Sequence, residues 1–369
     1  MNIPQGYKQT ELGIIPEDWE VKPIGECLSI GNGCDYKDKP FGNIPVYGTG
    51  GVITYINDYL YDGQTICIGR KGTINKPLYY EGKIWTVDTL YYTYNFIDVD
   101  VKYIYYLLLT IDWMSLNEAT GVPSLTSDRI RHILLALPPV AEQRAIAEAL
   151  SDIDGLIAAL DKKIAKKRLI KQGAMQQLLT GKKRLPGFSG PWMERKLGAI
   201  SHIKTGSCNG DQAVDNGKYP FFVRSQKVYA IDSYSYDVEA ILVPGEGGIG
   251  SIFHYINGKF DYHQRVYKIS DFADNVCGKY IFFYMSRYFG EYALSLTVKA
   301  TVDSLRLPTF EEFVICMPLN IEEQQAIATI LNDMDKEIDD LEAQRDKYRL
   351  LKSGMMQKLL TGQIRLKIK

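Results

Sequence analysis

The sequence predicts an α+β fold in which two strand-rich α/β globular domains are separated by two long helices that form an antiparallel coiled coil. Three observations predict it. A segment of the chain recurs 181 residues later, both copies carry apolar residues at coiled-coil spacing, and the segments between the copies are rich in β-branched and aromatic residues. A period of this length indicates duplicated domains, because solenoid repeats are only roughly 20–50 residues long.

The repeated segment contains no gap. Gln143 recurs as Gln324 and Gly181 as Gly362, so the distance of 181 residues is the same at both ends. Both copies read Gln-x-Ala-Ile-Ala near the start and Met-Gln-x-Leu-Leu-Thr-Gly at the end. Such close agreement indicates that both copies perform the same structural task.

The globular segments are also related, but more distantly. Trp192 matches Trp19 at a distance of 173 residues, whereas Ser304 matches Ser124 at a distance of 180. Small insertions have therefore accumulated between the matching residues. We expect a duplication of the whole unit, a globular segment followed by a helix, with a pseudo-two-fold relation between the halves.

Apolar residues in the repeat alternate at spacings of three and four, the a/d pattern of a coiled coil. The predicted seam consists of Ile146, Leu150, Ile153, Ile157, Leu160 and Ile164 in the first copy, and of Ile327, Leu331, Met334, Ile338 and Leu341 in the second. Polar residues, including Lys171 and Lys352, interrupt the seam further along and are a plausible means of fixing its register. A helix of about 40 residues is about 60 Å long.

Strands are predicted where β-branched and aromatic runs are bounded by Gly, Asn and Asp. The runs are Ile44–Tyr47, Thr65–Ile68, Lys83–Val87 and Leu90–Tyr94 in the first half, and Tyr219–Val223, Ala240–Val243 and Arg265–Ile269 in the second. Short helices are expected at Val101–Thr110 and Lys279–Tyr288. The resulting predicted boundaries are a globular domain over residues 1–140, a helix over 141–182, a globular domain over 183–320 and a helix over 321–369.

The composition is that of a globular protein with a formal net charge of −1. Residues 1–140 carry 11 basic and 16 acidic side chains, whereas residues 141–185 carry 10 basic and 5 acidic ones. The excess of positive charge lies mainly in one helical run, which contains Lys162, Lys163, Lys166, Lys167, Arg168 and Lys171. Such a run is either a solvated face or a surface for a phosphate backbone or an acidic partner.

The cysteines and the hydropathy pattern indicate a cytoplasmic protein. The six cysteines are scattered without a CxxC pair, which favours reduced thiols over disulfides or a zinc site. The N-terminal residues contain no apolar signal segment, and no stretch approaches 18 apolar residues. We therefore expect no membrane association.

Several of these motifs together resemble the specificity (S) subunit of type I restriction–modification systems. They are the two Gln-x-Ala-Ile-Ala copies, the Gln-x-Leu-Leu-Thr-Gly helix ends, the opening Leu12-Gly13-x-x-Pro16-x-x-Trp19, and the re-entry from Leu185 to Trp192. The resemblance covers essentially the full length. It implies two target recognition domains, each reading half of a bipartite, asymmetric sequence in double-stranded DNA, with the coiled coil as the ruler between them.

The resemblance also implies partners. Two modification subunits would carry methyl transfer, and restriction subunits would carry translocation and cleavage, so this chain is expected to be non-catalytic. The sequence agrees, because it has no Walker A loop, no Asn/Asp-Pro-Pro-aromatic motif and no metal-ligand spacing among its four histidines. We expect no cofactor and no metal.

One glycine-rich stretch requires a separate interpretation. Residues 245–250 read Gly-x-Gly-x-x-Gly after a predicted strand, as a dinucleotide-binding loop does. A helix would have to begin there to meet a pyrophosphate, but the following residues resemble a strand, with a hairpin turn at Asn257-Gly258. We interpret the stretch as a loop that lets the backbone approach a ligand or a DNA groove.

Candidate DNA-reading residues are polar and basic side chains in predicted loops, since base edges are read by hydrogen bonds and phosphate contacts set register. In the first domain they are Lys37, Lys39, Arg70, Lys71 and Thr89. In the second domain they are Arg224, Ser225, Gln226, Lys227, His263, Gln264 and Arg265.

Two further expectations concern the isolated chain. The acidic first domain predicts that the purified chain binds DNA weakly and that a modification subunit restores binding, because phosphate neutralisation supplies most non-specific affinity. The alternative is a non-catalytic scaffold in which the coiled coil spaces two protein-binding domains. That alternative predicts no response to DNA sequence.

Overall fold

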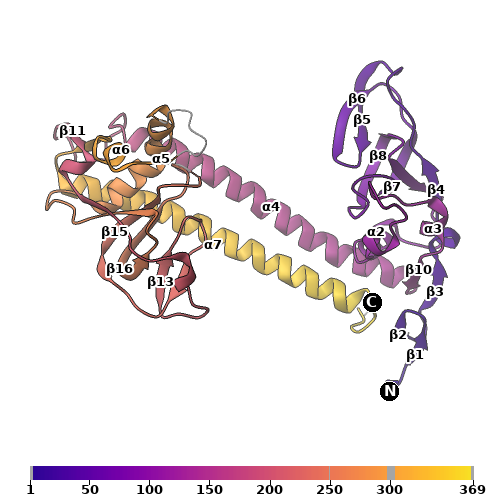
Figure 1. The fold of residues 1–369 in the computed structure, drawn as a ribbon. Coiled ribbons are helices and arrows are strands. Elements are labelled where there is room, and N and C mark those ends of the chain that lie inside the picture. The colour runs from indigo at the N-terminus through magenta and orange to yellow at the C-terminus, as the bar shows by residue number, and fades with distance from the viewer. Residues whose placement is uncertain (1–2, 249, 297–303, 367–369) are drawn as a thin grey trace. The chain divides into compact units, whose positions relative to one another are not determined.

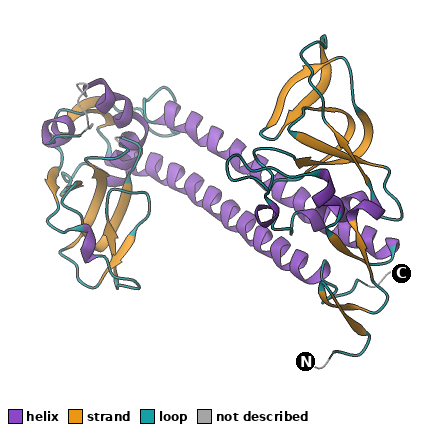
Figure 2. Ribbon diagram, turned by 45° about the vertical axis from the view of Figure 1, so that its right-hand side comes forward, coloured by secondary structure: helices purple, strands orange, loops and turns teal. Residues whose placement is uncertain are grey.

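The computed structural model describes all residues except 1–2, 249, 297–303 and 367–369 (Figure 1). Contacts divide the chain into two units: unit 1 comprises Met1–Leu160 with Gln344–Lys369, and unit 2 comprises Asp161–Ala343. Two 39-residue helices, α4 (Val140–Leu178) and α7 (Ile321–Leu359), each contribute residues to both units. The predicted combination of strand-rich domains with two long helices is confirmed (Figure 2).

Each unit contains a six-stranded sheet of the same topology. In unit 1 the order is β4 (Ser29–Asn32), β9 (Leu90–Tyr94), β7 (Tyr61–Gly69), β8 (Leu78–Thr86), β5 (Phe41–Gly48) and β6 (Gly51–Ile56). In unit 2 it is β12 (His202–Thr205), β17 (Val266–Ser270), β15 (Tyr236–Pro244), β16 (His254–Tyr262), β13 (Tyr219–Phe222) and β14 (Tyr229–Ile231). Neighbouring strands are antiparallel except for the parallel pairs β5–β8 and β13–β16. The duplication therefore extends to the strand order of the diverged segments.

A two-stranded ladder leads from each domain into its following helix. It pairs β3 (Glu20–Pro23) with β10 (Leu134–Leu137) in unit 1, and β11 (Trp192–Lys196) with β18 (Val314–Pro318) in unit 2. Unit 1 also contains the hairpin of β1 (Tyr7–Thr10) and β2 (Gly13–Pro16). The shorter helices are α1 (Ile24–Cys27), α2 (Val101–Leu108), η1 (Trp113–Leu116), α3 (Ser127–Arg131), η2 (Leu197–Ala199), η3 (Gly210–Gln212), α5 (Gly278–Leu296) and α6 (Leu307–Glu311).

The strand predictions are largely confirmed, with one error. The hairpin turn predicted at Asn257-Gly258 does not exist, because both residues lie inside β16 and pair with β15. Gly258 adopts φ +143°, a conformation that residues with a Cβ rarely adopt, so the strand requires glycine at this position. The helix predicted to end at Tyr288 continues to Leu296 as α5.

Each domain core includes the start of one long helix and the end of the other. In unit 1, Ile146 and Leu150 of α4 and Leu359 of α7 belong to the core that contains Ile104 and Trp113. In unit 2, the core is completed by Ile327, Leu331, Met175 and Leu178. Because burying such side chains supplies most folding free energy, the helix ends are integral parts of the domains.

A buried glutamine ties each domain to the helix that follows it. The Gln143 side chain accepts a hydrogen bond from the Asp100 N–H at 2.8 Å and donates one to the Pro138 carbonyl at 2.9 Å. Gln324 accepts from the Cys277 N–H at 2.9 Å and donates to the carbonyls of Asn275 and Pro318. These two residues begin the sequence repeat, and they satisfy backbone groups that would otherwise be buried without partners.

An arginine beyond the end of the other helix completes the attachment. Arg365 binds the carboxylate of Glu142 with two hydrogen bonds of 2.6 Å each and also contacts Asp18. Arg184 binds Glu323 in the same bidentate way, at 2.6 and 2.7 Å. Both glutamates are 1% exposed, so the paired arginine is what offsets the desolvation of each carboxylate.

Ion pairs show that the two helices run antiparallel within each unit. In unit 1, Asp154 of α4 pairs with Lys352 of α7 at 2.7 Å. In unit 2, Lys171 of α4 pairs with Asp335 of α7, and these four residues are related by the distance of 181. Lys171 and Lys352, which interrupt the apolar seam, therefore each form an ion pair with the other long helix. Lys167 and Arg168 also pair with α7, through Glu337 and Glu342, so half of the basic run is neutralised within unit 2.

The structure places the predicted seam residues at different depths. The buried ones are Ile146, Leu150, Ile153, Ile164, Ile327, Leu331, Ile338 and Leu341. Ile157, Leu160 and Met334 are partly exposed. No described helix is long and apolar enough to cross a membrane.

Replacing Gln324 by alanine tests the glutamine attachment. Removing three hydrogen bonds from a side chain that is 0% exposed leaves backbone groups unsatisfied, so we expect the free energy of unfolding of unit 2 to fall by about 2–4 kcal/mol. Hydrogen exchange should show lost protection of the Cys277 amide. The neighbouring exposed Gln325 provides the control, and equal effects of Gln324→Ala and Gln325→Ala would refute this role.

Candidate nucleic-acid interface

Backbone hydrogen bonds bring separate loops together at corresponding places in the two domains. We call each place a loop junction, comprising residues 33–34, 70–72, 86–90 and 123–125 in unit 1, and residues 206–208, 245–247, 262–266 and 304–305 in unit 2. The Arg70 N–H donates to the Thr89 carbonyl at 2.8 Å, and the Leu125 N–H donates to the Arg70 carbonyl at 2.9 Å. The junction therefore holds its shape through main-chain groups.

The junction of unit 2 repeats these bonds with different residues. The Gly245 N–H donates to the Arg265 carbonyl at 2.8 Å, and the Leu305 N–H donates to the Gly245 carbonyl at 2.7 Å. An isolated antiparallel bridge joins Glu246 to Ser304, as another joins Lys71 to Ser124 in unit 1. Position by position, Arg70 corresponds to Gly245 and Lys71 to Glu246.

Three predicted residues of the first domain meet at its junction. Arg70 and Lys71 are exposed, and their N–H groups share the Thr89 carbonyl as acceptor. The Arg70 guanidinium donates to the Asp88 carbonyl at 3.3 Å and lies 5.9 Å from the centre of the Tyr91 ring. These contacts leave most of the five guanidinium donors available.

The two remaining predicted lysines of the first domain bind acidic neighbours. Lys39 pairs with Asp58 at 3.1 Å and lies 5.1 Å from the centre of the Trp85 ring. Lys37 pairs with Asp35 at 3.8 Å and is 82% exposed. The Trp85 indole donates to the Cys34 carbonyl, which connects the Lys39 environment to the junction.

In the second domain Glu246 joins two of the predicted residues. Its carboxylate lies 2.8 Å from Arg265 Nη1 and 3.5 Å from Arg224 Nη1. His263 accepts a hydrogen bond from the Arg265 N–H at 2.9 Å through Nδ1. The Ser225 carbonyl lies 3.0 Å from Nε2 of His254. Two predicted arginines thus contact a glutamate that the sequence analysis did not select.

The other predicted residues of the second domain lie around this group. Gln264 donates to the Asn209 side chain at 2.9 Å. Lys227 lies 4.9 Å from the centre of the Tyr229 ring, and its carbonyl accepts from the Ser225 hydroxyl. Gln226 is exposed. The second junction therefore combines basic, amide and imidazole groups, the side-chain types that hydrogen-bond to bases and phosphates.

The glycine-rich stretch lacks the geometry of a dinucleotide site. No helix begins in the described residues of the stretch, and the next element is β16. Gly247 and Gly248 have φ of +72° and +74°, which explains why glycine occupies both positions. The sequence did not single out Glu246, which lies inside this motif; the structure places it where Lys71 lies in the first domain.

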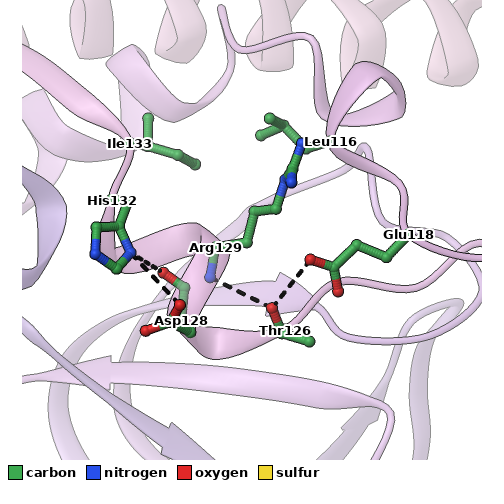
Figure 3. Close-up of a pocket in the computed structure, with 7 residues that line it drawn as sticks. All are labelled: Leu116, Glu118, Thr126, Asp128, Arg129, His132 and Ile133. Carbon is green, nitrogen blue, oxygen red and sulfur yellow. Dashed lines mark hydrogen bonds and ion pairs between the residues drawn. The ribbon is translucent and has the colours of Figure 1, made fainter.

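A pocket of unit 1 is lined by Leu116, Glu118, Thr126, Asp128, Arg129, His132 and Ile133 (Figure 3). Its polar side chains bind mainly to one another and to helix α3. The Thr126 hydroxyl accepts from the Arg129 N–H and donates to Glu118, while His132 contacts Asp128 (Figure 3). None of the predicted reading residues lines it. These side-chain contacts join the residues on either side of α3 to the helix.

Comparison with known proteins identifies the family. A sequence profile described as the type I restriction modification DNA specificity domain matches residues 16–167 and again residues 190–348. The chain belongs to this family. Each match covers one globular domain together with part of its following helix, in agreement with the structural duplication.

Full-length relatives have the same domain organisation. The chain is 25% identical to the type I restriction enzyme MjaVIII specificity subunit of Methanocaldococcus jannaschii, over 98% of this chain and 97% of that protein. It is 37% identical to the EcoDI specificity subunit of Escherichia coli over 21% of this chain and 17% of that protein. The crystal structure of the type I restriction–modification S subunit from M. genitalium has a similar fold, with a TM-score of 0.75 at 14% identity, covering 97% and 98% of the two chains.

The pKa of His263 tests the arrangement of charges at the second loop junction. Burial, followed by the charges of Arg224 and Arg265, holds the pKa of His263 below its ordinary value of 6.5, whereas Glu246 acts in the opposite direction. We expect Arg265→Ala to raise this pKa, because it removes a positive charge beside the imidazole. NMR titration of the four histidines measures the shift. Lys227→Ala is the control, and an unchanged pKa in Arg265→Ala would contradict the geometry.

Proposed function

We propose that this chain is the DNA sequence-specificity subunit of a type I restriction–modification complex. Each domain reads one half of a bipartite, asymmetric target in double-stranded DNA, and the two long helices set the spacing between the half-sites. The observation that carries the proposal is the contrast between the two loop junctions. Their main-chain hydrogen bonds correspond, while the side chains presented on them differ in size and charge.

The proposal assigns the chemistry to other subunits. Two modification subunits carry methyl transfer and restriction subunits carry translocation and cleavage, so this chain is a non-catalytic, cytoplasmic component. Its free cysteines are compatible with a reducing compartment. Within the described residues, no group of three or more His, Cys, Asp and Glu side chains is placed to hold a metal ion.

Partner subunits must supply part of the DNA affinity. Lys39, Arg224 and Arg265 are paired with carboxylates, and these pairs reduce the positive charge available for phosphates. Weak binding of DNA by the isolated chain follows, since neutralised phosphates determine non-specific affinity and its salt dependence. Tight, sequence-specific binding by the isolated chain in a salt titration would contradict this part of the proposal.

Paired substitutions separate the two domains. The target is first determined by methylation-site sequencing of DNA from a host that carries the complete system, where we expect a split motif methylated on both strands. In the reconstituted complex, Arg70→Ala with Lys71→Ala should weaken discrimination at one half-site, and Arg224→Ala with Lys227→Ala at the other. Each lost base contact corresponds to about 1–3 kcal/mol of discrimination.

Competition binding with duplexes mutated in either half-site measures this discrimination. Lys196→Ala, which removes an exposed residue paired with Glu312, is the control and should leave both half-sites unaffected. If neither double variant changes DNA selection, the residue assignments are wrong. If the wild-type complex shows no sequence preference, the scaffold function becomes the better explanation.

A further inference from the structure

Glu246 has an unusual place in the second loop junction. Its carboxylate contacts Arg265 of the same junction and Arg224, which is distant from Arg265 in the sequence. Its side chain is 23% exposed, whereas those of Arg224 and Arg265 are 53% and 58% exposed. The carboxylate therefore lies deeper than the two guanidinium groups it holds.

The contacts of Glu246 leave the arginines able to bind a further ligand. Each guanidinium has five N–H donors in a planar fork, and Glu246 contacts one nitrogen, Nη1, of each. Contact with Glu246 restricts the positions of both guanidinium groups before binding, which lowers the conformational entropy lost on binding. A guanidinium presented in this way matches the O6 and N7 acceptors of guanine in the major groove.

The backbone around Glu246 restrains the carboxylate. The bridge to Ser304 fixes the chain at Glu246. The chain before it is fixed by the Gly245 N–H, which donates to the Arg265 carbonyl, and by the Gly245 carbonyl, which accepts from the Leu305 N–H. Gly247 and Gly248, which follow, both have positive φ. Arg265 is therefore attached to the same loop twice, once by its carbonyl and once by its guanidinium. This double attachment gives Glu246 a defined position from which to orient both arginines.

The first junction has the opposite charge at the same position. Lys71 occupies the place of Glu246, as the bridges to Ser124 and Ser304 show, and the nearby Arg70 guanidinium is held by the Asp88 carbonyl. The exposed Lys71 ammonium can bind a DNA phosphate directly, whereas Glu246 binds two neighbouring arginines. The two domains therefore differ in how the side chain at this position would act on DNA.

We propose that Glu246 is a specificity-determining positioning residue, whose carboxylate holds Arg224 and Arg265 as a pair that reads guanine in the half-site of the second domain. This inference rests on the proposed function. It predicts that the half-site assigned to the second domain contains guanine on at least one strand.

The test compares Glu246→Ala and Glu246→Gln in the complex reconstituted with modification subunits. The probes are unmethylated duplexes that carry the motif identified by methylation-site sequencing. In each modified probe, 7-deazaguanine replaces one guanine of the motif, which removes the N7 acceptor of that base. We expect one such replacement in the second half-site to weaken wild-type binding roughly 10-fold. Glu246→Ala should weaken binding to unmodified DNA by a similar factor and show little additional loss with 7-deazaguanine.

The glutamine variant separates the hydrogen bonds from the charge. Its side-chain oxygen still accepts hydrogen bonds, so Glu246→Gln should retain most of the discrimination that Glu246→Ala loses. Both variants remove one negative charge, so the slope of log affinity against log salt on non-specific DNA should steepen by up to about one. Glu312→Ala removes another carboxylate of unit 2, one that pairs with Lys196, and should leave discrimination unchanged.

Several results would overturn the inference while leaving the proposed function intact. They are a second half-site without guanine on either strand, unchanged discrimination by Glu246→Ala, and equal loss at both half-sites, which would indicate general misfolding. Loss by Glu246→Gln as large as that by Glu246→Ala would also overturn it, because the charge would then matter and the acceptor would not. Absence of any sequence preference in the wild-type complex would instead refute the proposed function.

Discussion

The structure depends on the anchoring of each globular domain to two helix ends. A domain is held by the start of the helix that follows it, through Gln143 or Gln324, and by the end of the other helix, through Arg365 or Arg184. Each anchor buries polar groups that are costly to leave unpaired. Neither domain is complete within its own continuous stretch of chain, because its core includes side chains from both helices.

This anchoring explains why the sequence repeat has no gaps. Each anchor joins the two halves of the chain, Glu142 to Arg365 and Glu323 to Arg184. Two further ion pairs join α4 to α7 between these anchors, Asp154 with Lys352 and Lys171 with Asp335. Inserting one residue into a helix turns the following side chains by about 100°. The anchor and the ion pair could then not form together, so helix length and register are constrained at both ends of each copy.

The sequence correctly predicted those elements whose local residue pattern favours the same secondary structure as their tertiary packing. The strand Leu90–Tyr94 was predicted with its observed bounds, since an aromatic and β-branched run between polar residues has few other structures available. Asn257-Gly258 was wrongly predicted as a turn because a short turn signal describes only its neighbours, whereas strands β15 and β16 pair over seven consecutive residues in a continuous ladder. At the site, residues from separate loops were selected individually, but their meeting around Glu246 depends on tertiary hydrogen bonds between the loops. No local signal contains that information.

The two junctions combine corresponding main-chain hydrogen bonds with different exposed side chains. The loops are joined by main-chain hydrogen bonds, from Arg70 to Thr89 in one domain and from Gly245 to Arg265 in the other. A main-chain bond forms with any residue except a proline donor, so exchanging the side chains leaves the framework intact. Positions such as Lys71 and Glu246 can then differ even in the sign of their charge, whereas the buried residues of the helix anchors cannot. The degree of divergence along the chain thus follows from which chemical groups maintain the structure: side chains at the helix anchors, and the backbone at the loop junctions.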